Sequence, residues 1–224
     1  MIDPRQSVAS LVLDHSACAP VLQRHRIDYC CKGERSLADA CAERGLDPAT
    51  VAGELARAIE RDGSTVDRRA TPTPQLVAHI VTHHHAYLRE ALPFLRALSA
   101  KVRRVHGDHD PRLRELDDVV VALDESLGPH LAAEEQALFP TLLDARADRA
   151  LVARELASMR EEHLEVGALL GRVRAITADF ALPEWACASY RTLFAELGRL
   201  ETDVLEHVHL ENHVLAPRFA APEA

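Results

Sequence analysis

Four long stretches of helical periodicity, separated by short breaks, constrain the fold of this chain most. Beyond residue 74, apolar residues recur at intervals of three and four, which is the period of an α-helix. The stretches cover residues 74–105, 112–144, 148–176 and 183–214. Because short connections make neighbouring helices antiparallel, we expect an up-and-down four-helix bundle over residues 75–220. Pro93 and the Gly128-Pro129 pair should kink or restart their helices, since proline removes a backbone donor.

A smaller helical unit precedes the bundle. The run DGSTVDRRATPTP at residues 62–74 has the composition of a linker, which places a small N-terminal domain at residues 1–64. Its expected helices cover residues 18–26, 35–43 and 47–61. The last of these has Asp47 as its N-cap and Pro48 at its first helical position. With strand signals nearly absent, the predicted fold class is all-α.

Charge and cysteine usage exclude several classes of protein. The chain has 26 basic and 35 acidic residues, a net charge of -9, and no basic cluster, so we expect no binding to nucleic acid. No apolar stretch is long enough to span a membrane, and the first residues lack the features of a signal peptide. The 5 cysteines contain no C-x-x-C pair, which argues against a disulfide framework or a zinc knuckle. These features favour a reducing, cytoplasmic setting.

Two segments of the bundle repeat one motif. HLAAEEQALFP at residues 130–140 and HVHLENHVLAP at residues 207–217 both read H-x-x-x-E-x-x-x-L-x-P. The spacing of four residues places His130 and Glu134 on one helical face, and the same holds for His207 and Glu211. Two such helices can direct two imidazoles and two carboxylates to a common centre.

The first and third stretches each contribute a further histidine, near residue 85 and at His163. Four imidazoles and two carboxylates suit a pair of first-row metal ions, with the carboxylates bridging and two nitrogens for each metal. Another two-metal bundle pattern uses Glu-x-x-His on two helices. It fits worse, because only Glu206 and His209 have that spacing.

The same residues also have structural interpretations. The motif residues could form a solvated helical face, and His163, between the apolar Met159 and Val166, could be a core histidine with its hydrogen bonds satisfied. His84 and His85 both lie near the inner face by periodicity, and the residues alone leave this choice open. The other histidines are interpreted as surface or supporting residues: His15, His25, His79, His106, His109, His209 and His213.

With these motifs the sequence resembles the repair-of-iron-centres proteins, two-domain members of the hemerythrin-like group. DYCCKGERSLADAC at residues 28–41 is similar to the family's N-terminal cysteine module, and the likeness covers nearly the whole chain. The family's bundle holds two Fe ions in a non-haem centre bridged by two glutamates and an oxygen. The resemblance therefore implies an oxo-bridged di-iron cofactor. The implied metal ligands are His85, His130, Glu134, His163, His207 and Glu211.

The resemblance also decides between the two adjacent histidines. Counting back from Arg89-Glu90-x-Leu92-Pro93, which looks like the family's segment after its first ligand, selects His85. Two departures are visible: Ala216 stands where the family often has Phe, and Lys32 where Gly is common. Oxygen-carrying hemerythrins use a fifth histidine. Four would leave both irons less saturated, which predicts a reactive or labile centre.

Cys30 and Cys31 are adjacent, and adjacent side chains on a helix or turn point about 100° apart, so they are not expected to chelate one metal together easily. Nearby Arg26, Lys32 and Arg35 should favour the thiolate form. The pair could be buried packing residues or reactive thiols that transfer iron or electrons, or link two chains. The resemblance favours the reactive thiols. The remaining cysteines are interpreted as packing residues: Cys18, Cys41 and Cys187.

The resemblance implies a function: restoring iron-sulfur clusters damaged by nitrosative or oxidative stress, by supplying iron. Damaged iron-sulfur proteins would then be the partners, and a homodimer through the N-terminal module is a further expectation. One alternative is an enzyme that reduces nitric oxide at the two irons. Another is a sensor in which bound oxygen or nitric oxide changes how the N-terminal module engages a partner. Ligand type alone does not select iron over manganese.

Overall fold

The computed structural model describes residues 2–62 and 68–220, and these residues are predominantly helical. They fall into two compact units. One unit combines Met1–Leu76 with Leu205–Ala224, and the other is Val77–Val204. In the described part of the chain, β-structure is limited to an isolated antiparallel bridge between Ser7 and Ser36. The predicted all-α class is therefore confirmed.

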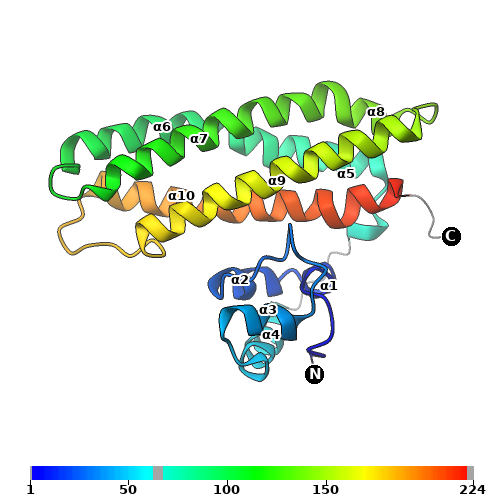
Figure 1. Cartoon of the computed structure of the whole chain (residues 1–224), viewed down its shortest axis with the longest axis horizontal. Coiled ribbons are helices and arrows are strands. Elements are labelled where there is room, and N and C mark those ends of the chain that lie inside the picture. The colour runs from blue at the N-terminus through cyan, green and yellow to red at the C-terminus, as the bar shows by residue number, and fades with distance from the viewer. Residues whose placement is uncertain (1, 63–67, 221–224) are drawn as a thin grey trace. The chain divides into compact units, whose positions relative to one another are not determined.

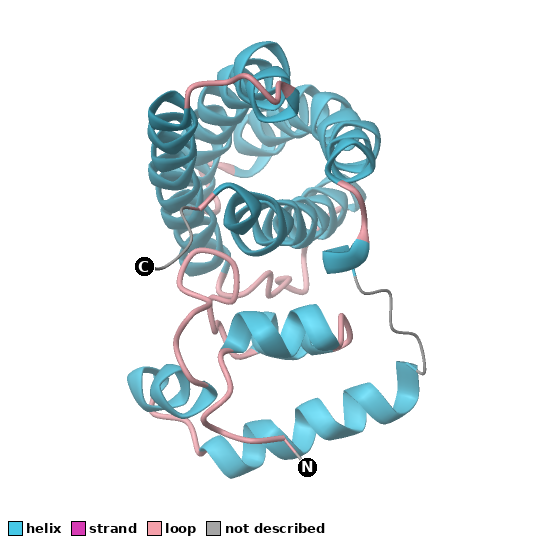
Figure 2. Cartoon of the chain, turned by 90° about the vertical axis from the view of Figure 1, so that its right-hand side faces the viewer, coloured by secondary structure: helices cyan, strands magenta, loops and turns pink. Residues whose placement is uncertain are grey.

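The bundle consists of four long helical stretches, which run side by side in Figure 1 and surround a common axis in Figure 2. The first is α5 (Thr73–His79), η2 (Ile80–His85) and α6 (Ala86–His106), and the second is α7 (Arg112–Ala133), η3 (Glu134–Leu138) and α8 (Phe139–Leu143). The third is α9 (Arg149–Thr177). The fourth is α10 (Ala188–Leu210), η4 (Glu211–Leu215) and η5 (Ala216–Phe219). The expected up-and-down four-helix bundle is confirmed.

Apolar side chains at helical spacing form the core of the bundle, and buried polar pairs connect its neighbouring helices. Leu88, Leu92 and Leu95 of α6 are examples of the buried stripe. Asp117 of α7 accepts hydrogen bonds from Ser99 at 2.6 Å and Arg103 at 2.8 Å, both on α6. These contacts fix α6 against α7, and an ion pair between Arg174 and Glu201 does the same for α9 and α10.

The helices are interrupted at other places than the sequence predicts. Both α6 and α7 continue through Pro93 and Pro129, so the expected restart does not occur at either proline. Instead, three wider π-helical turns occur, at η2, η3 and η4. In the last two, the N–H of the residue before the motif proline reaches back five residues, to the carbonyl of Glu134 or Glu211. The wider turn thus lies where the following proline cannot donate to an α-helical ladder.

The N-terminal module consists of α1 (Val8–Asp14), α2 (Cys18–Arg24), α3 (Leu37–Arg44), α4 (Pro48–Asp62) and η1 (Arg68–Ala70). As predicted, Asp47 caps α4, because its carboxylate accepts from the N–H groups of Ala49 and Thr50. The short α1 was not predicted. Its buried apolar residues join Leu22, Leu37 and Leu55 in a small core. The predicted linker at residues 62–74 lies partly outside the described residues.

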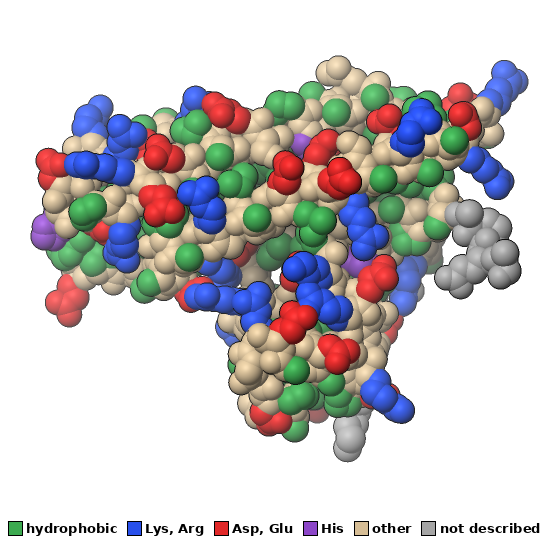
Figure 3. Space-filling model, viewed as in Figure 1, with side chains coloured by type: hydrophobic (Ala, Val, Ile, Leu, Met, Phe, Trp, Pro, Cys, Tyr) green, Lys and Arg blue, Asp and Glu red, His purple; other side chains and the backbone are tan. Residues whose placement is uncertain are grey.

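Charges of both signs are interspersed along the face of the bundle seen in Figure 3. None of the helices in the described residues is both long and apolar enough to cross a membrane.

Candidate metal centre

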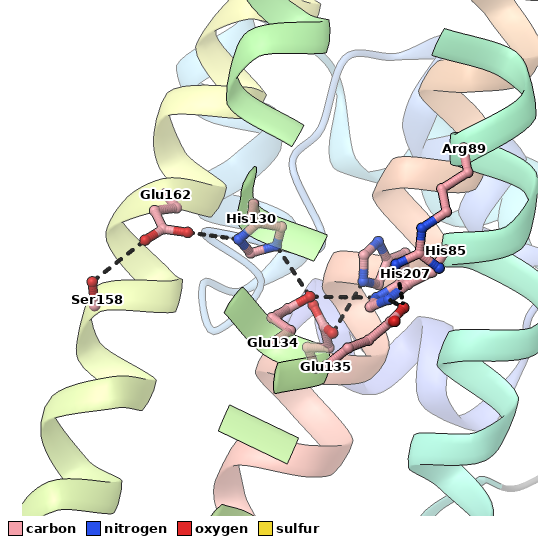
Figure 4. Close-up of polar contacts among 9 residues, drawn as sticks. His85, Arg89, His130, Glu134, Glu135, Ser158, Glu162 and His207 are labelled. Atoms are coloured by element: carbon pink, nitrogen blue, oxygen red, sulfur yellow. Dashed lines mark hydrogen bonds and ion pairs between the residues drawn. The ribbon is translucent and has the colours of Figure 1, made fainter. Parts of the chain in front are cut away.

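Three predicted ligands meet around one carboxylate in Val77–Val204. The Nε2 atom of His85, the last residue of η2, lies 3.3 Å from Oε2 of Glu134. Nε2 of His130 lies 3.4 Å from the same oxygen (Figure 4). The ring of His163 on α9 is adjacent to His130, with 5.1 Å between their centroids. All four side chains are buried.

The second copy of the motif repeats the contact between its histidine and its glutamate. Nε2 of His207, in the last turn of α10, lies 3.0 Å from Oε1 of Glu211, the first residue of η4. Both residues are fully buried. In both copies, the i, i+4 spacing therefore brings the histidine and the glutamate into contact, as the sequence predicts.

The six predicted ligands come together in two overlapping groups. Within each group, the candidate ligand atoms all lie within 4.8 Å of one another. One group is His85, Glu134, His207 and Glu211, and the other is His130, Glu134, His163 and Glu211. Both groups contain the same two carboxylates. His84 belongs to neither group, and its Nδ1 instead lies 3.0 Å from Asp203.

Two outer carboxylates orient the ligand imidazoles. Oε1 of Glu135 accepts a hydrogen bond from Nδ1 of His85 at 2.7 Å. The same oxygen forms an ion pair with Arg89 at 2.8 Å. Glu162 accepts from Nδ1 of His130 at 2.6 Å (Figure 4). Because Nδ1 carries the proton in each ring, the lone pair of Nε2 is directed towards Glu134. Sequence reasoning missed both carboxylates; the one available signal is that each is adjacent in sequence to a predicted ligand.

The charge state of Glu135 fits this role. Burial acts to raise the pKa of Glu135, but the hydrogen bonds from His85 and Arg89 outweigh burial and lower that pKa. The carboxylate is thus ionised at neutral pH and acts as an acceptor.

The donor set fits metal ions. Buried carboxylates and imidazoles at this density are costly unless a cation or protons compensate them. Imidazole nitrogen and carboxylate oxygen are suitable ligands for iron, manganese and zinc. Ligating histidines in proteins characteristically donate their other ring N–H to a carboxylate or carbonyl, as His85 and His130 do here. On these grounds, the two groups of histidines and glutamates can hold a metal ion.

Cys30 and Cys31 lie in a loop between α2 and α3. Oδ1 of Asp28 accepts from the backbone N–H groups of Cys30 at 3.1 Å and Cys31 at 2.8 Å. The loop brings the two Sγ atoms to 3.6 Å. The expectation that the two thiols diverge, made for a helix or a turn, is therefore wrong, because the Asp28 cap gives this loop a different local geometry.

The charge environment of Cys30 also differs from the expectation. The hydrogen bond with Cys31, burial and the charge of Asp28 together raise the pKa of the Cys30 thiol well above its usual range. Arg35, which was expected to favour a thiolate, pairs with Glu43. The raised pKa therefore favours the protonated thiol of Cys30 at neutral pH.

Residues of the fourth helical stretch bind the backbone of this cysteine loop. Nδ1 of His209 donates to the carbonyl of Tyr29 at 3.1 Å. Asn212 and His213 donate to the carbonyl of Cys30, at 3.1 Å and 2.8 Å. Burial, followed by the neighbouring His213, lowers the pKa of His209 to about 4, so this imidazole is neutral near pH 7.

The other cysteines divide into two kinds. Cys18 and Cys41 are buried in the N-terminal module, as predicted. Cys187 is exposed, and its Sγ lies 3.2 Å from Nε2 of His106, so its assignment as a packing residue is wrong.

Each of the two parts of the chain matches the model of a known protein family. Residues 76–219 match the model of the hemerythrin HHE cation binding domain. Residues 4–59 match a domain of unknown function, DUF542. The iron-sulfur cluster repair protein YtfE of Escherichia coli O157:H7 is 33% identical over 218 residues, covering 97% of this chain and 98% of that protein. The YtfE protein of Escherichia fergusonii has the same identity and coverage.

Proposed function

Because the chain belongs to the hemerythrin-like family of iron-sulfur cluster repair proteins, we propose that it restores clusters damaged by nitrosative or oxidative stress, acting as an iron donor. The observation that carries the proposal is the pair of donor groups that share Glu134 and Glu211. The partners would be damaged iron-sulfur proteins in the cytoplasm.

Two irons, joined by an oxo bridge, are the cofactor we assign to these groups. His85 and His207 would hold one iron and His130 and His163 the other, and Glu134 and Glu211 belong to both groups of ligands. When bound, iron supplies redox chemistry and exchangeable coordination positions. The four protein donors of each group are fewer than the six of an octahedral ion. This open coordination supports a centre that releases iron or binds a diatomic molecule.

The chain's own residues would keep the ligands in place while a metal leaves or returns. Glu135 and Glu162 hold the Nδ1 protons of His85 and His130, which fixes the ring orientation and the tautomer. Arg89 in turn holds Glu135. Burial of all six ligands limits the access of water and competing ligands.

We also assign Cys30 and Cys31 to the transfer of iron or electrons. Their support is the short separation of the two thiols and the attachment of their loop to His209, Asn212 and His213 in the same stretch as His207 and Glu211. Replacing both cysteines by serine should leave the di-iron spectrum intact and abolish repair. Unchanged repair would remove the thiols from the mechanism.

The direct test combines iron content with repair. Anaerobically purified wild type should carry close to two irons per chain, with the spectrum of a coupled pair, and should rebuild the cluster of a damaged target protein. Glu134→Ala should lose both the iron and the repair, whereas Glu161→Ala, at an exposed glutamate of α9, should keep both. Wild type without iron, or with a single zinc, would contradict the proposal.

Open coordination also favours a second candidate, reduction of nitric oxide at the same site. Turnover of nitric oxide with an electron donor, at a rate that accounts for protection, would favour the enzyme over the donor. Reassembly of a cluster without nitric oxide turnover would favour the donor. If both fail while nitric oxide or oxygen still binds, the protein is a sensor.

A further inference from the structure

The loop around Cys30 has an unusual local geometry for two adjacent residues. On a helix their side chains would diverge by about 100°. Here Oδ1 of Asp28 caps the backbone N–H groups of Cys30 and Cys31, and the chain turns tightly around that carboxylate. As a result, the two Sγ atoms lie 3.6 Å apart, and Sγ of Cys30 lies 3.3 Å from Oδ1 of Asp28.

These three side chains form a compact donor set. One carboxylate oxygen and two sulfurs all lie within 4.8 Å of one another. Cys30 and Cys31 are only 2% and 7% exposed, while Asp28 is half-buried. Sulfur donors select soft, thiophilic cations, in contrast to the nitrogen and oxygen donors of the bundle.

We propose that Asp28, Cys30 and Cys31 form a second metal site, which binds one thiophilic divalent cation such as iron(II) or zinc(II). A tetrahedral ion on three protein ligands keeps one position open. The open position allows a thiol or carboxylate of another molecule to complete the shell, which suits a site that passes metal on. This site does not depend on the bundle holding iron.

The fourth helical stretch preorganises this site. The carbonyls of Tyr29 and Cys30 accept hydrogen bonds from His209, Asn212 and His213. Gly33 closes the loop against the same segment, since an added Cβ would lie 2.3 Å from the carbonyl oxygen of Tyr29 and 2.8 Å from Nε2 of His213. The backbone of the loop is thus fixed before a metal arrives, which lowers the cost of gathering the ligands.

Cobalt(II) titration of the full-length apoprotein tests the site, because thiolate-to-cobalt charge-transfer absorption reports sulfur ligands alone. The titration is done in a Glu134→Ala, Glu211→Ala background, so that the bundle does not compete for the ion. We expect one thiolate-bound cobalt per chain, lost in Cys30→Ser and in Cys31→Ser. Asp28→Asn can still cap the loop through its amide oxygen but removes the charge, and should weaken binding by about tenfold or more.

Cys187→Ser is the matched control, since it removes the exposed thiol near His106 and should leave the band unchanged. Circular dichroism and thermal unfolding of each full-length variant verify that its helical fold is retained. Absence of the band in the parent, its loss in Cys187→Ser, or undiminished affinity in a folded Asp28→Asn would each overturn the proposal. Because the readout contains no repair step, failure here removes the thiols as a metal site but leaves the iron-donor role of the bundle standing, and failure of repair in turn leaves this metal site standing.

Discussion

The two copies of the H-x-x-x-E-x-x-x-L-x-P motif share their ligand positions but differ in what surrounds them. In both, the histidine lies one turn before the glutamate, and a π-helical turn begins at the glutamate. The residue after the glutamate differs. In the first copy Glu135 accepts from the ligand His85, whereas in the second Asn212 donates to the carbonyl of Cys30.

The flanking positions follow the same division. His209 and His213, which bind the cysteine loop, align with Ala132 and Gln136 of the first copy. The first copy therefore supports the ligand shell, and the second connects a ligand-bearing helix to the cysteine loop. The motif therefore constrains the ligand positions and the π-helical turn, while the residues between its fixed positions differ in role between the two copies.

The largest expected effect tests what the copies share. Glu134→Ala and Glu211→Ala should each reduce the iron content from close to two per chain to near zero, because both carboxylates belong to both donor groups. Iron analysis and spectroscopy of the coupled pair measure this. A variant that retains one tightly bound iron would show that its glutamate serves a single metal.

The aligned pair Glu135 and Asn212 tests the difference between the copies. Glu135→Ala should weaken metal affinity by roughly tenfold to a hundredfold, since His85 loses the acceptor that orients it. Asn212→Ala should leave that affinity within about twofold, because it contacts the loop instead. Competition against a chelator measures both variants. Equal losses of metal affinity in Glu135→Ala and Asn212→Ala would contradict the different roles assigned to the two copies of the motif.

Gly33 tests how closely the loop is held. Gly33→Ala places a Cβ against backbone and against His213, and should destabilise the protein by on the order of 1–3 kcal/mol. Gly53→Ala in α4 is the control. An added Cβ there would lie 3.8 Å from the flexible guanidinium of Arg57, so this substitution should stabilise the protein by roughly 0.5–1 kcal/mol. Thermal unfolding compares them, and a tolerated Gly33→Ala would mean a looser loop.

The smallest expected effect concerns one hydrogen bond. His213→Ala removes a donor from the carbonyl of Cys30, worth about 1 kcal/mol, while Asn212 still donates. Thiol labelling of Cys30 and Cys31 should become about fivefold faster, the factor that corresponds to about 1 kcal/mol. Gln136→Ala, at the aligned position of the first copy, should not change the labelling rate. Equal labelling rates in His213→Ala and Gln136→Ala would show that His213 does not stabilise the cysteine loop.

Local patterns in the sequence predicted the bundle and the contact within each His–Glu pair of the motif, because an i, i+4 pair shares a helical face whatever surrounds it. They did not predict the π-helical turns, since proline was expected to act at Pro93 and Pro129, whereas the turns precede Pro140 and Pro217. The geometry of the cysteine loop also could not be predicted from local patterns, because it depends on an Asp28 cap and on contacts with residues some 180 positions away. Periodicity carries no information on such pairings.

The three hydrogen bonds that His209, Asn212 and His213 donate to the cysteine loop end on main-chain carbonyl oxygens. A carbonyl offers the same lone pairs whichever side chain its residue carries. The three hydrogen bonds therefore need no particular side chain at Tyr29 or Cys30, and a free thiol and a metal thiolate present the same carbonyl acceptors. Because these bonds involve no sulfur atom, the two thiols stay available for ligands while the main chain of the loop is held.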